Sequence, residues 1–340
     1  MASVQLANSV DAVHSLCSQQ GEGVAAVDTG AVLPSTAWIG VMRDNTCGEQ
    51  HHDRAEDEAP GSHGIPLAML HKVLRCLCDE PFERDMDPRT RRNIVVRAAA
   101  LNGDVDVVRY MCELPHDRGV DPSADDNYAI RQAAQLGHVD VVRYLCELSP
   151  DQGVDPSARN NDALRKAAQG GHVAAVRYLC ELPPDRGVDP SAQDNYAIRL
   201  AVACGHVDVV RYLCELRPDR GVDPSVLCND AIYVAARSGH ADVVRYLCEL
   251  PTDRGVDPSA LDNDAIRRAA QLGHVDVVRY LCELPPDRGV DPSADDNYAI
   301  RQAAQSGHAD VVRYLCELPP DRGVDPSAQD NDAIYVAARS

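Results

Sequence analysis

A block of 34 residues repeats from about Asn93 to Asp330, and this period constrains the fold more than any other feature of the chain. The copy that runs from Asn127 to Asn160 reads NYAIRQAAQLGHVDVVRYLCELSPDQGVDPSARN, and its register returns every 34 residues up to Asn331. A unit this short cannot bury a core alone, so neighbouring copies have to stack and bury their apolar faces against one another. The period therefore predicts one repeat solenoid instead of a compact globular domain.

The composition favours thin layers of small side chains and a protein partner. Of the 340 residues 44% are hydrophobic but only 4% are aromatic, so the core has to be built from Ala, Val, Leu, Ile and Cys. The formal net charge of -20 disfavours nucleic acids and anionic lipid surfaces, because both would be repelled. Neutral or basic protein partners remain open.

Each copy begins with a short helix, which we call helix A. Ile130 and Ala133 lie on one face of a helix of about ten residues, and Gly137 is suited to the left-handed position that ends it. Asp126 or Asn127 is placed to cap its start.

A second helix, helix B, follows the turn at Gly137. Four of its apolar residues have the spacing i, i+3, i+4, i+7: Val141, Tyr144, Leu145 and Leu148. Val142 and Cys146 widen this apolar face. The remaining face forms a charged strip that we expect to be exposed, made of Asp140, Arg143 and Glu147. Pro150 ends the helix, and an extended connector leads from there to Pro156.

A helix, a turn at Gly137-His138, a second helix and a connector at Gly153-Val154-Asp155 together resemble the ankyrin repeat. The resemblance covers about 240 residues and implies an all-α solenoid of helix-turn-helix repeats that binds other proteins. Two features depart from the family pattern: Tyr128-Ala129 replaces the usual Thr-Pro, and the Asp-x-x-Gly tip of the projecting hairpin finger is missing. A tetratricopeptide array has the same period, but its Trp and large aromatic positions are absent here.

The repeats divide the chain into four parts. Residues 1–64 are polar and are expected to be disordered or weakly structured, and residues 65–92 read as a degenerate N-terminal capping repeat. Residues 93–330 hold seven ankyrin-like repeats, and residues 331–340 are an eighth repeat reduced to helix A. Because a solenoid needs a polar cap at each end, we expect that the chain is a fragment or that a partner covers its end.

Cysteine and histidine each form a column in the repeat, and both columns are interpreted as structural. Copies stacked roughly 8 to 10 Å apart place equivalent Cα atoms beyond the ~7 Å limit for a disulfide. Zinc would need four ligands at one point, whereas these thiols are spread along the stack. A histidine that follows glycine in six copies fits a turn-stabilising hydrogen bond better than catalysis, which needs one residue in one pocket. The cysteines of the column are Cys112, Cys146, Cys180, Cys214, Cys248, Cys282 and Cys316.

Differences between copies gather on a stripe of helix A opposite its apolar face and on the turn before it. Drift on a solvated face would produce such differences too, but the recurring Tyr favours binding, since Tyr is enriched in interfaces. The candidate partner-binding residues are Asp125, Tyr128, Gln132, Arg159, Asp162, Lys166, Tyr196, Leu200, Asp230, Tyr233, Asp264, Arg268, Tyr298 and Gln302. A second column is expected to pair with nearby carboxylates and comprises Arg131, Arg165, Arg199, Arg267 and Arg301.

The sequence thus predicts a noncatalytic protein-interaction scaffold that binds a protein partner along the concave surface of helix A and its turn. No cofactor, metal, catalytic residue or small-molecule substrate is expected, because no phosphate loop, nucleophile motif or metal motif occurs. The N-terminus does not read as a secretory signal, and free thiols suit a reducing compartment, so a cytoplasmic location is expected. Two alternatives remain: an adaptor whose N-terminal segment recruits other machinery, or a fragment of a larger enzyme or membrane protein.

Overall fold

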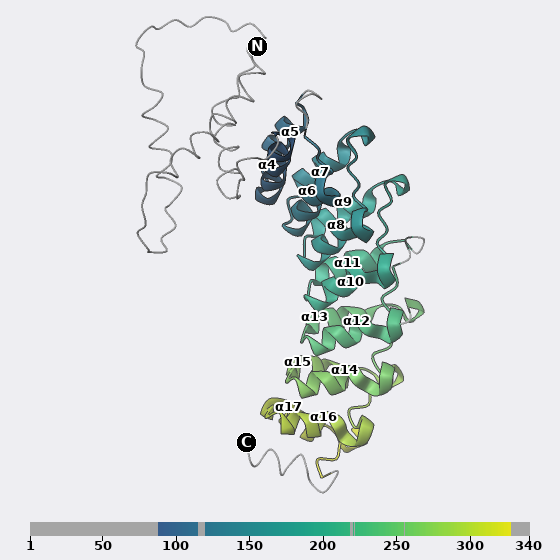
Figure 1. The fold of residues 1–340 in the computed structure, drawn as a ribbon. Coiled ribbons are helices and arrows are strands. Elements are labelled where there is room, and N and C mark those ends of the chain that lie inside the picture. The colour runs from purple at the N-terminus through teal and green to yellow at the C-terminus, as the bar shows by residue number, and fades with distance from the viewer. Residues whose placement is uncertain (1–87, 115–119, 218–219, 221, 255, 328–340) are drawn as a thin grey trace, which may run out of the picture. The chain divides into compact units, whose positions relative to one another are not determined.

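The computed structural model describes residues 88–327, apart from short gaps at 115–119, 218–219, 221 and 255. The predicted N-terminal segment, most of the predicted capping repeat and the truncated eighth repeat lie outside these residues. Within the described part, the chain forms fourteen α-helices in seven consecutive pairs, each a helix A followed by a helix B (Figure 1). Residues 88–92, placed in the capping repeat by the sequence, form the first turn of the first helix A.

The bounds of the helices follow the 34-residue period. The helices A are α4 (Pro88–Asn102), α6 (Ala124–Gln135), α8 (Ala158–Gln169), α10 (Ala192–Ala203), α12 (Val226–Arg237), α14 (Ala260–Gln271) and α16 (Ala294–Gln305). The helices B are α5 (Val105–Cys112), α7 (Val139–Glu147), α9 (Val173–Glu181), α11 (Val207–Glu215), α13 (Ala241–Glu249), α15 (Val275–Glu283) and α17 (Ala309–Cys316). The connectors were expected to be extended, but most hold a single 3-10 turn: η3 (Pro150–Gln152), η4 (Pro184–Arg186), η6 (Thr252–Arg254), η7 (Pro286–Arg288) and η8 (Pro320–Arg322).

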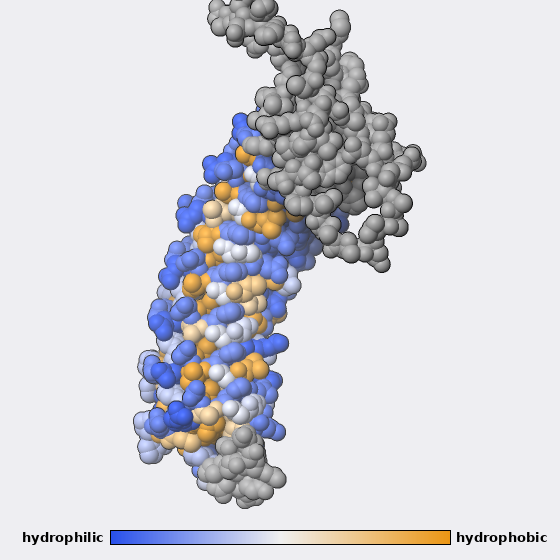
Figure 2. Space-filling view, turned by 90° about the vertical axis from the view of Figure 1, so that its left-hand side faces the viewer, coloured by the Kyte–Doolittle hydropathy of each residue, from blue (hydrophilic) through white to orange (hydrophobic). Residues whose placement is uncertain are grey.

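The core consists of most of the residues that the periodicity predicted, but Tyr144 is only half-buried, as is Leu148, which lies just beyond the end of α7. Each helix A packs against the helix A of the next copy and against its own helix B, and successive helices B also pack together. Ile130, Ala133, Val141 and Leu145 are fully buried, and the same positions are buried in the other copies. The surface carries the same period, since hydrophobic and hydrophilic patches recur from copy to copy along the stack (Figure 2).

The Gly-His turn joins one copy to the copy before it. Gly137 has a φ of 75°, which glycine adopts without strain. The Nε2–H of His138 donates to the carbonyl of Leu101 at 2.9 Å, 37 residues earlier. The imidazole lies so close to the preceding turn that a Cβ on Gly103 would stand 2.5 Å from His138 Nδ1. The predicted hydrogen bond is therefore confirmed, but it fastens neighbouring copies together instead of bracing one turn.

Asparagine at the start of helix A fixes the connector that leads to the next copy. The Oδ1 of Asn127 accepts the backbone N–H of Asp155 at 2.8 Å, and Asn161 accepts that of Asp189 at 2.9 Å. The predicted capping role of Asn127 is therefore wrong, because its side chain turns toward the next connector. The carboxylate of Asp155 in turn accepts the backbone N–H and the hydroxyl of Ser157, which orders the Asp-Pro-Ser turn.

Arginine in the connector caps the helix B of the preceding copy. Nη1 of Arg186 donates to the Cys146 carbonyl at 2.6 Å, and its Nη2 donates to the Val154 carbonyl at 3.3 Å. Arg254, Arg288 and Arg322 repeat both bonds. A cation at this end of a helix satisfies a carbonyl that lacks an intrahelical partner and offsets the helix dipole.

The copy that begins at Asn127 departs from this arrangement, because Gln152 stands where the later copies have Arg. The Oε1 of Gln152 is buried and has no hydrogen-bond partner within the described residues. A buried polar atom without a partner costs about 1–3 kcal/mol. The junction between α5 and α7 is therefore the one where an arginine would add most.

We predict that Gln152→Arg stabilises the chain by about 1–2 kcal/mol, since a guanidinium at this position reaches the carbonyls of Cys112 and Val120. The urea midpoint of unfolding should rise. Arg186→Gln, the reverse change one copy later, should lower that midpoint by a similar amount. An unchanged or lower midpoint for Gln152→Arg would contradict the capping role of the connector arginines.

Candidate interaction surface

The start of helix A has an unusual backbone that we call the tip. The tip is the pair of residues before the Asn in each helix A from α6 onward: Asp125-Asp126, Arg159-Asn160, Gln193-Asp194, Leu227-Cys228, Leu261-Asp262 and Asp295-Asp296. Asp125, Asp126 and Asn127 all lie in the left-handed region, with φ near 55–62° and ψ near 41–50°. The helix expected to begin at about Asn127 thus starts at Ala124 and passes through a left-handed turn.

The tip backbone is held from both sides while its side chains face outward. The N–H of Asn127 donates to the Ser123 carbonyl at 2.8 Å, which closes the turn. Arg131 donates from Nε to the Asp126 carbonyl at 2.9 Å and from Nη2 to the Asp125 carbonyl at 3.1 Å. The side chains of Asp125 and Asp126 remain exposed. The tips therefore display variable side chains on a backbone fixed by constant ones.

Left-handed backbone is costly for residues other than Gly, Asn and Asp. The cost is about 1–2 kcal/mol per residue. Arg159, Gln193, Leu227 and Leu261 nevertheless have φ between 54° and 55°. Strain of this kind persists only where the surrounding structure imposes it, and it concentrates at functional sites.

The candidate residues predicted from the sequence fall into two groups. Asp125 and Arg159 lie on tips and are exposed, and Tyr196 on helix A is 36% exposed. The others are half-buried in the described stack, so the helix A stripe is less open than predicted: Tyr128, Gln132, Asp162, Lys166, Leu200, Asp230, Tyr233, Asp264, Arg268, Tyr298 and Gln302.

Tyrosine members of the stripe lie against arginines from two copies. The Cζ of Arg97, on the preceding helix A, is 5.6 Å from the centre of the Tyr128 ring, and that of Arg131 is 5.8 Å away. Tyr196 lies in the same way between Arg165 and Arg199, at 5.5 and 5.7 Å. These distances suit cation–π attraction.

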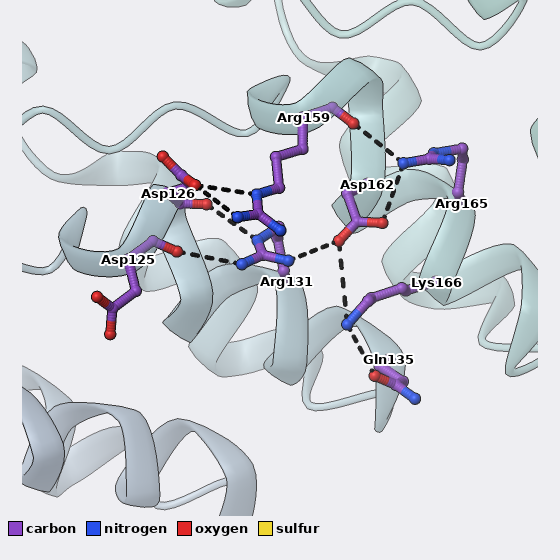
Figure 3. A network of polar contacts seen from close by, with 8 residues as sticks. All are labelled: Asp125, Asp126, Arg131, Gln135, Arg159, Asp162, Arg165 and Lys166. Carbon is purple, nitrogen blue, oxygen red and sulfur yellow. Dashed lines mark hydrogen bonds and ion pairs between the residues drawn. The ribbon is translucent and has the colours of Figure 1, made fainter. Parts of the chain in front are cut away.

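Aspartate members of the stripe meet the same arginines as ion-pair partners. Oδ2 of Asp162 lies 2.8 Å from Nη1 of Arg131, and its Oδ1 lies 3.1 Å from Nη2 of Arg165 (Figure 3). Lys166 adds a third cation at 3.9 Å. Arg199 pairs with Asp230 at 2.7 Å. The prediction that the arginine column pairs with nearby carboxylates is confirmed for these residues.

Tyr and Asp alternate in the stripe because both accept a guanidinium neighbour. The neighbours come from the same copy, three residues later, and from the previous copy, 31 residues earlier. The recurrence of Tyr, which favoured binding at the sequence level, is thus accounted for by contacts between copies. Among the tips, Asp125, Arg159 and Asp295 also make ion pairs with neighbouring copies, whereas no ion pair joins Gln193, Asp194 or Leu227 to the rest of the described residues.

Two tip residues outside the predicted set are the most exposed large hydrophobic side chains of the described residues. Leu227 is 54% exposed and Leu261 is 56% exposed. The sequence marks both as variable, but a local pattern cannot tell an exposed turn leucine from a buried one. The combination that identifies them, a left-handed backbone and an exposed aliphatic side chain, becomes visible only in the structure.

The buried thiols of the cysteine column are poorly reactive. The thiols are free, and those from Cys112 to Cys282 are buried, whereas Cys316 on the last described helix is exposed. Burial raises the pKa of the Cys146 and Cys214 thiols to about 12, so the reactive thiolate is scarce at neutral pH.

Among the described residues no cluster of three or more His, Cys, Asp or Glu side chains is arranged to hold a metal ion. None of the helices in that part has the length and apolar character needed to cross a membrane.

Comparison with known proteins identifies the type of repeat. A family model described as ankyrin repeats (3 copies) matches residues 148–227 and 216–296. The copies within residues 148–296 are thus ankyrin repeats, and the copies on either side repeat the same 34-residue unit. Among solved structures, an ankyrin repeat family protein from Legionella pneumophila is 23% identical, with a TM-score of 0.37 over 69% of this chain and 72% of that chain. No curated protein matches the chain.

We predict that Asp162→Tyr changes the free energy of unfolding by less than about 1 kcal/mol, because Arg131 and Arg165 would then flank a ring as they do at Tyr128 and Tyr196. Asp162→Ala should instead cost about 1–2 kcal/mol, since it leaves the largely buried guanidinium of Arg131 without its anion. Urea unfolding of the two variants checks this. Equal destabilisation by Tyr and Ala would show that the two residue types are not interchangeable partners of arginine.

Proposed function

We propose that this protein is a noncatalytic scaffold that binds a protein partner through its tips and the adjoining helix A stripe. Ankyrin repeats generally serve as protein–protein interaction modules. The observation that carries the assignment of the surface is the chemistry of the tips. Their described side chains are exposed, vary along the stack and stand on a strained backbone, while most of the repeated polar residues hold copies together.

The helix B side fits this role less well. Its exposed strip repeats nearly the same charges in every copy, as with Asp140, Arg143 and Glu147. Tyrosines beside this strip are engaged internally: the Tyr144 hydroxyl donates to the Arg109 carbonyl at 3.4 Å, and its ring lies 5.3 Å from the Arg109 Cζ. A uniform surface offers little to distinguish one partner from another.

The buried free-thiol column supports a location in a reducing compartment, and we place the protein inside the cell on that ground. The alternatives of an adaptor or a fragment of a larger protein depend on residues outside the described part of the chain. They stay predictions.

The test uses glycine, because glycine removes the side chain and also suits the left-handed backbone. One variant carries Gly at the first residue of each tip: Asp125, Arg159, Gln193, Leu227, Leu261 and Asp295. We predict that its unfolding midpoint equals or exceeds that of the wild type, because relief of strain offsets the added chain entropy. Proteins captured by the wild type in affinity purification, identified by mass spectrometry, should be lost from this variant.

A matched control changes exposed aspartates on helix B: Asp140→Asn, Asp208→Asn and Asp276→Asn. This control should recover the same partners as the wild type. If the glycine variant also recovers them, the partner does not bind the tips and the proposed surface is wrong. Because this variant is expected to be no less stable, loss of the partner would not be a consequence of unfolding.

A further inference from the structure

Apolar residues at the variable positions are concentrated on three adjacent helices. Four positions that are polar or charged in the flanking copies are aliphatic here: Leu200 on α10, Leu227 and Val234 on α12, and Leu261 on α14. The corresponding residues elsewhere include Gln132, Lys166, Arg268 and Gln302 on the stripe and Asp125, Arg159, Gln193 and Asp295 on the tips. Helices α10 and α12 pack together, as do α12 and α14, so these residues belong to one local region.

Leu227 and Leu261 each carry two unfavourable features at once. Both have a φ of 54°, where leucine is strained, and both expose more than half of their surface. Two other exposed leucines, Leu136 at 45% and Leu272 at 46%, have ordinary φ values of -99° and -98° at the ends of α6 and α14. Exposure alone therefore also occurs in leucines outside the tips, and among the described leucines its combination with strain is confined to Leu227 and Leu261.

The tips of α10 and α12 are held differently from the other four. In α6, α8, α14 and α16 an arginine of the same helix donates to the tip carbonyls, as Arg131 and Arg267 do. In α12 the position of that arginine is taken by Tyr233, which has no guanidinium. The Leu227 backbone thus lacks this clamp, and so does the tip of α10, where Arg199 donates to the Asp230 carboxylate instead.

Carboxylates without partners surround the two leucines. At the N-terminal tips Asp125 pairs with Arg97, and Asp126 lies 2.7 Å from Nη2 of Arg159. Asp194 and Asp262 are exposed and have no ion pair within the described residues. The region therefore combines an aliphatic centre with negative charge at its rim, in a chain of net charge -20.

We propose that the tips of α12 and α14 bind a basic segment of the protein partner, with an aliphatic or aromatic side chain on Leu227 and Leu261 and Lys or Arg beside Asp194 and Asp262. This proposal rests on the proposed function and names the chemistry of its partner. Charge favours a basic segment over a second copy of this chain as the occupant of this surface. A second copy of this chain would bring the same negative charge to the surface, whereas a basic segment gains attraction as well as apolar contact.

The test selects ligands without assuming their sequence. A phage-displayed library of random 12-residue peptides is selected against the full chain, and synthetic versions of the enriched peptides are titrated by fluorescence anisotropy. Enriched peptides should carry an aliphatic or aromatic residue flanked by Lys or Arg, and their affinity should fall as salt is raised. Leu227→Ala with Leu261→Ala should weaken binding by about tenfold or more, as loss of central apolar anchors does.

Two further variants complete the design. Leu136→Ala with Leu272→Ala removes leucines of similar exposure outside the tips and should leave affinity within about twofold, as residues outside an interface do. Asp194→Asn with Asp262→Asn should weaken binding and flatten its salt dependence. Sedimentation of the full chain shows whether a second copy occupies the patch instead: a dimer that dissociates in the tip leucine variant would overturn the proposal.

The proposal is also overturned if no peptide is enriched, if enriched peptides are acidic or uncharged, or if the tip leucine variant binds them like the wild type. These outcomes are distinct from a failure of the proposed function. If the six-glycine variant loses the captured partner but the tip leucine variant binds as the wild type does, only the basic-segment proposal fails. If the six-glycine variant keeps its partner, the tip surface itself is wrong.

Discussion

The hydrogen bond that a connector amide donates to the asparagine at the start of helix A fixes the link to the next copy, and it illustrates the constraint on which this structure depends. No 34-residue unit can bury its own core, so each has to be completed by its neighbours. Most of the strictly repeated polar residues answer this requirement. Asn127 accepts a hydrogen bond from the connector that leads to the next copy. His138 donates a hydrogen bond to the turn of the previous copy, and Arg186 caps the previous helix B. Repetition in this sequence therefore reflects contacts between copies at least as much as contacts inside one copy.

Variation between copies has two different causes. On the helix A stripe, Tyr and Asp replace one another because each accepts arginines from its own copy and from the previous one, as Tyr128 and Asp162 show. On the tips no such exchange is visible, since Arg159, Gln193 and Leu227 share neither charge nor shape. The first kind of variation is compensated inside the stack, and we propose that the second serves the binding of a partner.

The sequence predicted the parts of the structure that follow local rules. Period and apolar spacing predicted the helix pairs, and Ile130, Val141 and Leu145 are buried as expected. Glycine at the turn and histidine after it were correctly interpreted as structural. These features depend on residues close together in the chain or on the repeat itself.

The candidate surface was harder to predict because it depends on register between copies and on backbone strain. Arg131 meets Asp162 only once two copies are aligned 31 residues apart, so the stripe looked like a free surface. The left-handed tips contradict local propensity, since Leu227 and Leu261 would not choose that conformation alone. They arise because the hydrogen bond from the Asn amide to the Ser carbonyl closes a turn around them. This constraint cannot be read from any single residue.

Hydrogen exchange at one connector amide tests most directly whether the bonds that fix the connectors between copies hold the stack together. The N–H of Asp189 donates to Oδ1 of Asn161 at 2.9 Å. The account predicts that this amide exchanges as slowly as helix A amides of the adjoining copies, and that Asn161→Ala removes its protection and lowers that of both neighbours. Exchange at the rate of an unstructured amide in the wild type, or protection unaffected by Asn161→Ala, would contradict it.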